Sequence, residues 1–291
     1  VTATPPAVGS PPDPGLFGPG SVTWRVHADL SMFVGGLRAL LVQTLHPRAM
    51  AAVAEHSSYR EDPLGRLHRT SAFIAATTYG TRAEAEGAVA NVRRIHEQVR
   101  GVAPDGHPYS ASDPELLAWV HAVEVDSFLT AYLRYGAGLD DDDADRYVDE
   151  MAVVGQMVGV EDPPRRVAAL HAELDGFDEV RGTGQARDAV RFILFPPLPI
   201  VARPAHAILA AAAVGLVPPD YRRMLWLPAL PLTDPLVVRP ATRAFLAGLG
   251  WALGENPTLA RANARCAASF LVSAVDGQFG EENQRSRRGK R

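Results

Sequence analysis

The chain has 291 residues, of which 47% are hydrophobic and 21% are charged, a composition typical of a globular protein and unlike that of disordered or fibrous chains. Its net charge of -4 argues against nucleic-acid binding, which needs a surplus of lysine and arginine. The single cysteine, Cys266, excludes a disulfide framework and paired-cysteine metal sites, and we expect a reducing, cytoplasmic compartment.

The two ends of the chain differ from its middle. Residues 1–20 are mainly proline, glycine and other small residues, which predicts a flexible arm that buries too little surface to order itself. Residues 276–291 form a polar, basic tail. Between them we expect one domain over residues 21–275. It lacks the uninterrupted run of ~20 apolar residues that crosses a bilayer, so we expect no transmembrane segment.

Apolar residues recur three and four positions apart through this domain, which predicts an all-α fold. The best candidate strand, residues 194–201, contains prolines that remove the ladder donors. Helix starts are indicated by prolines in first turns and by the capping-box pair Thr81 and Glu84. In chain order, we expect helices over residues 23–45 with a weak point at Gly35-Gly36, then 47–55, 63–78, 82–100, 114–135, 143–158, 164–175, 185–195, 204–215, 219–227, 236–253 and 257–272.

Several common enzyme classes lack their signatures here. No GxxxxGK[ST], GxSxG or HExxH string occurs, which argues against P-loop, serine-hydrolase and zincin chemistry. No histidine has a glutamate three residues before it, so a ferritin-like di-iron bundle is excluded. Cys266 lacks the glycine-rich loop of a haem-thiolate protein, and we expect a buried, inert cysteine.

Two of the expected helices carry polar residues where a core-facing stripe would be apolar. On the first, Arg66, Arg69 and Thr70 share one face with Phe73 and Thr77. The second has basic residues at i, i+3 and i+7 of one face.

The basic face of the second helix consists of Arg93, His96 and Arg100. Three such side chains repel one another unless an anion lies between them. A haem supplies one, because its iron binds a neutral imidazole and its two propionates bind guanidinium groups. Alternatively, His96 is an ordinary core or surface histidine and the arginines pair with nearby carboxylates. The carboxylates available for such pairs are Glu97, Glu84 and Asp62.

Three ordered motifs connect the chain to a known family. The first runs from His46-Pro47 to residues 62–70, Asp-Pro-Leu-Gly-Arg-Leu-His-Arg-Thr. The second is residues 92–100, Val-Arg-Arg-Ile-His-Glu-Gln-Val-Arg, and the third runs from Tyr109 through Asp113-Pro-Glu-Leu-Leu to Trp-Val-His121. Together, over residues 20–275, they resemble the MpaB / rubber-oxygenase (latex clearing protein) catalytic domain family, in its short bacterial branch.

This resemblance implies a globin-like multi-helix domain around one b-type haem, with O₂ as co-substrate. The best-known relatives cleave carbon–carbon double bonds of isoprenoid chains. By resemblance, His96 is the proximal iron ligand, and Arg93 and Arg100 are the basic residues that flank it. Arg66 and Thr70 match the distal Arg-x-x-x-Thr element.

Two departures from the family pattern affect the distal side. Arg69 stands where rubber oxygenases have a lysine that caps the iron, and a guanidinium is a poor ligand because it stays protonated. The distal carboxylate of those enzymes has no clear counterpart, and Glu55, His56 and His46 are the nearby substitutes.

The sequence therefore predicts a haem-dependent oxygenase that uses O₂ on a small apolar substrate, isoprenoid-like, alkene-like or aromatic. Two alternatives stay open: a haem-binding sensor or carrier without turnover, and a haem-free all-α interaction module. His121 either lines the pocket or is a hydrogen-bonded core histidine. The mostly uncharged residues 192–232 either line an apolar substrate tunnel or belong to an ordinary core.

Overall fold

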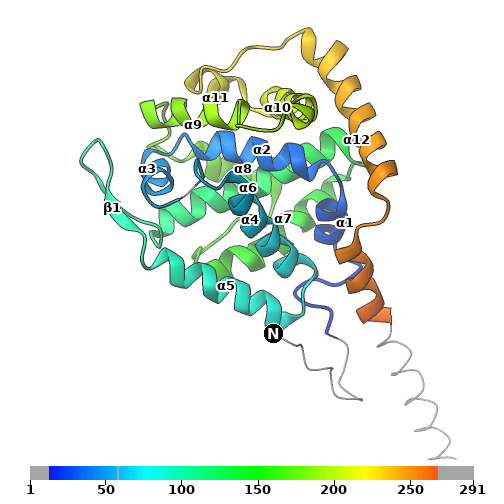
Figure 1. Cartoon of the computed structure of the whole chain (residues 1–291). Helices are drawn as coiled ribbons and strands as arrows, with labels where there is room; N and C mark the ends of the chain where they lie inside the picture. The colour runs from blue at the N-terminus through cyan, green and yellow to red at the C-terminus, as the bar shows by residue number, and fades with distance from the viewer. Residues whose placement is uncertain (1–12, 58, 268–291) are drawn as a thin grey trace, which may run out of the picture.

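The computed structural model describes residues 13–57 and 59–267, and within them the chain forms an all-α domain with one small β-hairpin (Figure 1). Residues 257–267 are helical as well. The elements are α1 (Val22–Ala28), α2 (Met32–Gln43), α3 (Pro47–His56), α4 (Pro63–Tyr79), α5 (Arg82–His96), β1 (Arg100–Val102), β2 (Pro108–Ser110), α6 (Pro114–Tyr135), α7 (Asp141–Val158), α8 (Val167–Asp175), α9 (Gly184–Leu194), the 3₁₀ turn η1 (Ile200–Ala202), α10 (Arg203–Leu216), α11 (Pro219–Met224), the π-helical segment η2 (Asp234–Val238) and α12 (Arg239–Leu253).

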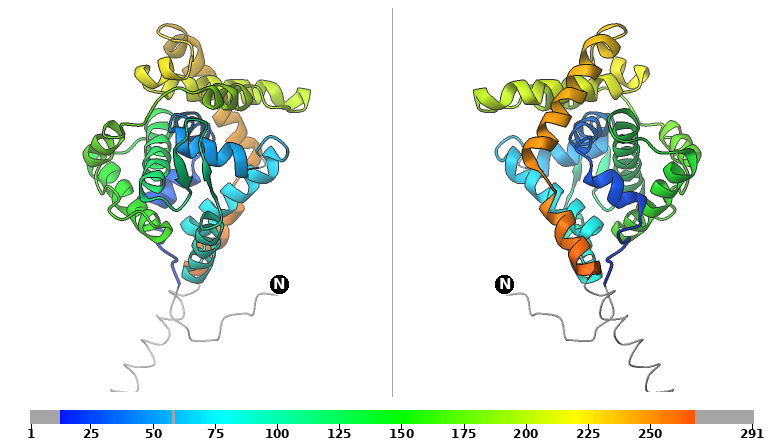
Figure 2. Two further views of the ribbon diagram at one scale, coloured as in Figure 1. Left: turned by 90° about the vertical axis from the view of Figure 1, so that its left-hand side faces the viewer. Right: turned by 90° about the vertical axis from the view of Figure 1, so that its right-hand side faces the viewer.

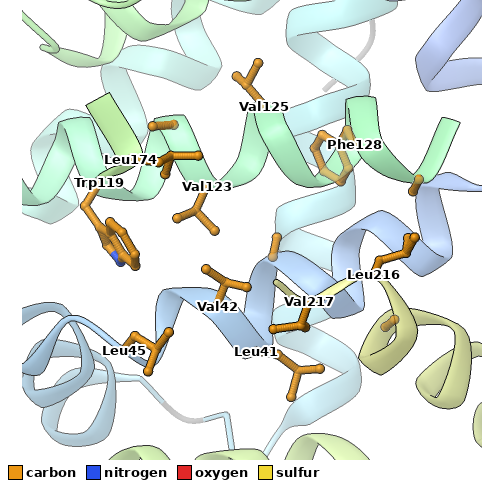
Figure 3. Close-up of a cluster of buried hydrophobic side chains, with 14 of the residues drawn as sticks. Leu41, Val42, Leu45, Trp119, Val123, Val125, Phe128, Leu174, Leu216 and Val217 are labelled. Atoms are coloured by element: carbon orange, nitrogen blue, oxygen red, sulfur yellow. The ribbon is translucent and has the colours of Figure 1, made fainter. Parts of the chain in front are cut away.

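The centre of the domain is the contact between α2 and α6. Val42 of α2 faces Val123 of α6, and Trp119 of α6 points toward α2, while Leu41 packs on the other side of α2 (Figure 3). The helices approach closely because Gly35 lies against the side chain of Phe128, where a Cβ atom would come within 2.9 Å of the ring. The apolar side chains at this contact are what the three- and four-residue periodicity predicted.

A buried ion pair ties the same two helices to α10. The Arg38 guanidinium lies 2.7 Å from the Asp126 carboxylate and also donates to the Ser127 hydroxyl and to the Leu216 carbonyl oxygen. Both charged side chains are almost fully buried. Such a pair is well formed only because the guanidinium meets several acceptors at once, and removal of one partner would leave a buried charge.

The remaining helices cover this core from two sides. Helices α9, α10 and α11 lie above α2, and α12 runs down one side of the domain (Figures 1 and 2). Helices α4 and α5 form a hairpin on the opposite side of α2, and the β1–β2 hairpin projects beside α3 (Figure 1). Helices α9, α10 and α11 therefore lie on one side of α2, and helices α4 and α5 lie on the other (Figure 1).

Most predicted helix starts are confirmed by their caps. Asp62 accepts a hydrogen bond from the backbone of Gly65, and Asp113 accepts one from the backbone of Glu115. Thr81 and Glu84 form both halves of the predicted capping box. These caps satisfy the backbone N–H groups that a helix start leaves unpaired.

Three local predictions are wrong. The break in residues 23–45 falls at residues 29–31, where the Asp29 carboxylate accepts from the Ser31 backbone, and not at Gly35-Gly36, which packing holds in α2. Helix α5 ends at His96 and does not reach residue 100. The hairpin of β1 and β2 was not predicted, because strands of three residues show no measurable alternation.

The first residues that the structure describes make specific contacts with the domain. Asp13 accepts hydrogen bonds from the Arg82 backbone, and Phe17 packs beside Trp24, Tyr79 and the buried Cys266. Residues 13–20 of the predicted arm therefore have defined packing partners. Residues 1–12 and 268–291, including the predicted tail, lie outside the described residues.

Helix α6 meets the criteria for a membrane-spanning helix by length and composition, although the sequence analysis expected no such segment. It has 22 residues, and 67% of its most apolar window is buried inside the domain. The central helix of a folded core passes the same test, so α6 is weak support for a membrane span.

Candidate functional site at the start of α4 and the end of α5

Helices α4 and α5 are antiparallel neighbours joined by Gly80 and Thr81. This connection places the first turns of α4, which carry Arg66, at the same end of the hairpin as the last turn of α5, which carries His96. The predicted candidate residues of both helices therefore belong to one region of the surface.

The candidate residues of α4 differ in exposure and partners. Arg66 is half-buried, and its guanidinium donates to the Ser57 hydroxyl after α3. Burial lowers the pKa of Arg66, because a charged guanidinium loses hydration there. Arg69 is exposed and pairs with Asp62 at 3.2 Å, while Thr70 is exposed. Of these three side chains, Arg66 is therefore the one that is partly shielded from water and held by a hydrogen bond to the end of another helix.

His96 is the last residue of α5, and its imidazole has no hydrogen-bond partner among the described residues. Its Nδ1 atom is buried, and burial lowers the pKa of the ring, which favours the neutral form at neutral pH. One turn earlier, Arg93 donates to the Met157 carbonyl oxygen at 3.3 Å and so connects α5 to the end of α7. A buried polar atom without a partner is costly, so this atom could accept a partner from a bound molecule; both ring nitrogens of the buried His46 are unpartnered in the same way.

Arg100 does not share the helix face of His96, which corrects the prediction. After His96 the chain turns, and the backbone groups of residues 99–102 pair with the β2 side of the hairpin. Gly101 lies in β1 against Tyr109, where a Cβ atom would come within 2.4 Å of the hydroxyl oxygen. Arg100 therefore follows the helix at the first position of β1 and donates from Nε to the Glu97 carbonyl oxygen.

Of the three carboxylates considered as partners of Arg93 and Arg100, none pairs with either arginine within the described residues. Arg69 pairs with Asp62, but the Glu84 carboxylate accepts from the Thr81 backbone in the capping box. The guanidinium groups of Arg66, Arg93 and Arg100 contact a hydroxyl or backbone carbonyl oxygens and form no ion pair within the described part of the chain. These guanidinium groups therefore have the capacity to bind an anion.

The end of α3 connects the two sides of this region. The Glu55 carboxylate accepts a hydrogen bond from the Tyr109 hydroxyl, and His56 Nε2 lies 3.2 Å from both that hydroxyl and the Arg100 carbonyl oxygen. Ser57, next in the chain, is the partner of Arg66. Burial and the neighbouring Glu55 raise the pKa of Tyr109 to about 12, so this phenol keeps its proton at neutral pH.

Of the three substitutes considered for the distal carboxylate, His46 is separated from this region. It lies at the N-terminal end of α3 and is fully buried beside Trp119, with a ring-centroid distance of 6.0 Å. Glu55 and His56 lie at the other end of the same helix, about 14 Å away at 1.5 Å per residue. The geometry therefore keeps Glu55 and His56 as candidates.

Helix α6 contributes two further titratable side chains with shifted pKa values, His121 and Glu124. His121 is buried with its Nε2 against Gly155 of α7, and burial lowers its pKa to about 4. Glu124, one turn later, has its pKa raised to about 7 by burial. The sequence analysis missed Glu124, although a glutamate one turn from a histidine in an apolar helix was a usable signal.

The donor set fits a haem better than a protein-built metal site. The described residues contain no group of three or more His, Cys, Asp or Glu side chains placed to bind a metal ion. A haem iron needs only an axial ligand from the protein, because the porphyrin supplies its other nitrogen ligands. The orphaned imidazole of His96 and the unpaired guanidinium groups match the iron and the propionates in chemistry.

Comparison with known proteins adds one finding. A family model described as "ER-bound oxygenase mpaB/B'/Rubber oxygenase, catalytic domain" matches residues 24–251. This range contains the whole α4–α5 region and the helices that pack around it. No curated protein and no solved structure matches the chain.

Proposed function

Because the chain belongs to the mpaB/B' and rubber-oxygenase catalytic domain family, we propose that it is a haem-dependent oxygenase whose iron is bound by His96. The family consists of oxygenase catalytic domains, so an oxidoreductase that uses O₂ follows from membership. The dependence on haem, the roles of the residues and the class of substrate are our proposals. The observation that carries them is the unpartnered imidazole of His96 among arginines that form no ion pair in the described residues.

The chain's own residues would hold the haem by charge and by a neutral nitrogen ligand. The lowered pKa of His96 keeps its imidazole deprotonated and free to donate a lone pair. Arg66, Arg93 and Arg100 would bind the propionates, because guanidinium groups bind carboxylates through paired hydrogen bonds. A bound haem supplies the iron chemistry that activates O₂.

We assign proton handling to the end of α3. Glu55 and His56 both contact the Tyr109 hydroxyl, whose raised pKa keeps the proton on its oxygen. This arrangement gives a carboxylate that can accept a proton and a hydroxyl that can orient it. Thr70 of α4 would contact the substrate, whereas Arg66 would serve the propionates and Arg69 would stay with Asp62.

The substrate we propose is a small apolar molecule with an electron-rich double bond, in line with the family resemblance. We test this proposal with haem-loaded protein, squalene and farnesol as alkene probes, and an oxygen electrode. We expect O₂ uptake that depends on the probe and on haem, with labelled oxygen from ¹⁸O₂ appearing in the product. His68→Ala is the control, because this exposed histidine of α4 has no hydrogen-bond partner among the described residues.

The same experiment separates an oxygenase from an oxygen carrier. Haem-loaded protein that binds O₂ reversibly and consumes none with either probe would overturn turnover and leave a sensor or carrier. Protein that binds no haem at all would overturn the proposal at its first step.

A further inference from the structure

The second feature that the structure assigns is a large cavity lined by α9, α10, the loop between them and the loop after α11. These helices lie on the far side of α2 from α5 (Figure 1). Its volume is about 1050 Å³, at the upper end of the range for ligand pockets. It is lined by residues between 187 and 230, and so part of the mostly uncharged stretch 192–232 lines a cavity as well as a core.

The interior of the cavity is apolar. Its floor is one face of α10, where Ala207 and Ala211 occupy little volume and leave the space open. Leu194 of α9 and Leu227 of the loop close it from the sides. The ring of His206 also lines the wall, but its Nε2 lies 2.9 Å from the Ile193 carbonyl oxygen, so that atom is already paired. An occupant of this interior therefore needs an apolar body.

The rim of the cavity is cationic. Its charged lining residues are Arg187, Arg191 and Arg203, and the lining contains no carboxylate. Arg187 and Arg191 stand one turn apart on α9 and so share one face. The Arg191 guanidinium has no hydrogen-bond or ion-pair partner among residues 13–57 and 59–267. An anion at this rim would meet two neighbouring guanidinium groups.

The wall beside these arginines has a defined conformation. Trp226 has φ of +56°, a left-handed backbone conformation that bulky residues rarely adopt. This conformation places the indole under Arg187, whose guanidinium carbon lies 4.1 Å from the ring centroid. The stack fixes Arg187 at the rim, where it faces incoming anions.

We propose that this cavity binds an amphiphile with a long apolar chain and an anionic head group, the chain against α10 and the head between Arg187 and Arg191. A sugar or nucleotide would leave its polar groups unpaired in the apolar interior. A neutral hydrocarbon would make no use of the cationic rim.

The proposal is independent of the haem site, and its test needs no haem. Haem-free protein is titrated with a fluorescent long-chain polyene carboxylate below its micelle concentration, and dodecyl phosphate and dodecanol are then used as competitors. We expect saturable binding and displacement by dodecyl phosphate at a concentration at least about tenfold lower than that of dodecanol, because the head group gains charge-assisted hydrogen bonds. The carboxylate and phosphate arms show which head group binds more tightly.

Variants separate the rim from the interior. Arg187→Gln with Arg191→Gln should weaken the carboxylate probe about tenfold and leave dodecanol unchanged. Ala211→Phe should weaken both, because the ring occupies the cavity. The matched controls are Arg261→Gln and Ala247→Phe, at exposed positions outside the cavity, and circular dichroism confirms that each variant is folded.

Three binding results would overturn the proposal. They are no saturable binding to the wild type, equal competition by dodecanol and dodecyl phosphate, and unchanged binding in the folded Arg187→Gln/Arg191→Gln variant. If size-exclusion chromatography shows that the wild type is a dimer that dissociates in Ala211→Phe, a second copy of the chain fills the cavity and the amphiphile proposal falls.

Discussion

The two ends of α4 present two histidines in opposite situations. Near its C-terminal end, His27 is buried with Nδ1 2.7 Å from the Thr78 hydroxyl and Nε2 3.0 Å from the Tyr147 hydroxyl. Near its N-terminal end, beyond Arg66, His96 of α5 has no partner among the described residues. The first histidine is part of the protein's own packing, whereas the second is the residue that we propose as the iron ligand. Burial alone does not distinguish them, but their hydrogen-bond partners do.

The C-terminal end of α4 should carry the larger share of the fold's stability. Trp24 is 3% exposed, donates to the Thr78 carbonyl oxygen and packs edge-on against Tyr79 at 5.3 Å. We expect Trp24→Ala to lower the free energy of unfolding of haem-free protein by about 3–5 kcal/mol, as measured by urea denaturation. A loss below about 1 kcal/mol would show that packing at the C-terminal end of α4 contributes little to the stability of the fold.

At the other end, replacement of Arg66 should separate stability from ligand binding. Its guanidinium is desolvated without a carboxylate partner in the described chain, so Arg66→Met should leave the stability of haem-free protein unchanged or raise it. The same variant should bind haem at least about tenfold more weakly, because an arginine–propionate contact is lost. Parallel urea denaturation and haem titration measure both effects. A large loss of stability with unchanged haem binding would show that Arg66 supports the fold and does not bind the haem.

His27 should also give the paired end a pH dependence. Burial lowers its pKa to about 3, so the folded state stays neutral while the unfolded state takes up a proton below about pH 6.5. Stability then falls with decreasing pH, by about 2 kcal/mol between pH 7 and pH 5 at roughly 1.4 kcal/mol per pH unit. His27→Gln lacks the titrating group, so its stability should change less over this interval. An equal slope in both proteins would contradict the assignment of His27 as a buried neutral ring.

The smallest effect is expected for Arg69, which lies one turn from Arg66 but is exposed. Its pair with Asp62 spans 3.2 Å between side chains that are both more than half exposed. We expect Arg69→Gln to change the free energy of unfolding by less than about 0.5 kcal/mol and to leave haem content unchanged. A haem titration in which Arg69→Gln binds as weakly as Arg66→Met would show that exposure does not separate these two arginines.

The sequence predicted the features of the fold that are set by residues close together in the chain, such as helix caps. The all-α fold and most helix starts follow from local signals, such as Asp62 before Pro63 and Thr81 before Glu84. The break at residues 29–31 and the end of α5 at His96 were missed because tertiary contacts decide them. Gly35 is kept helical by packing against Phe128, and residues 99–102 are drawn into the hairpin by β2.

The candidate site shows the same limit. Spacing alone identified Arg66 and His96 as residues worth attention, and the family match places both within an oxygenase catalytic domain. Spacing gave no means to see that His27 finds Thr78 and Tyr147 as partners while His96 finds none. It also failed to separate Glu55 from His46, because the separation depends on which end of α3 meets the β-hairpin.

The account rests on His96 as the iron ligand, and absorption spectroscopy of protein from haem-sufficient cells tests this most directly. Wild type, His96→Gly and the control His68→Ala are compared in oxidised and dithionite-reduced form, and imidazole is then added to His96→Gly. We predict a Soret band in wild type and control that shifts to longer wavelength on reduction, a strong loss of this band in His96→Gly, and its recovery with imidazole. A wild type that stays colourless after addition of haemin, or a His96→Gly spectrum identical to wild type without imidazole, would contradict the assignment.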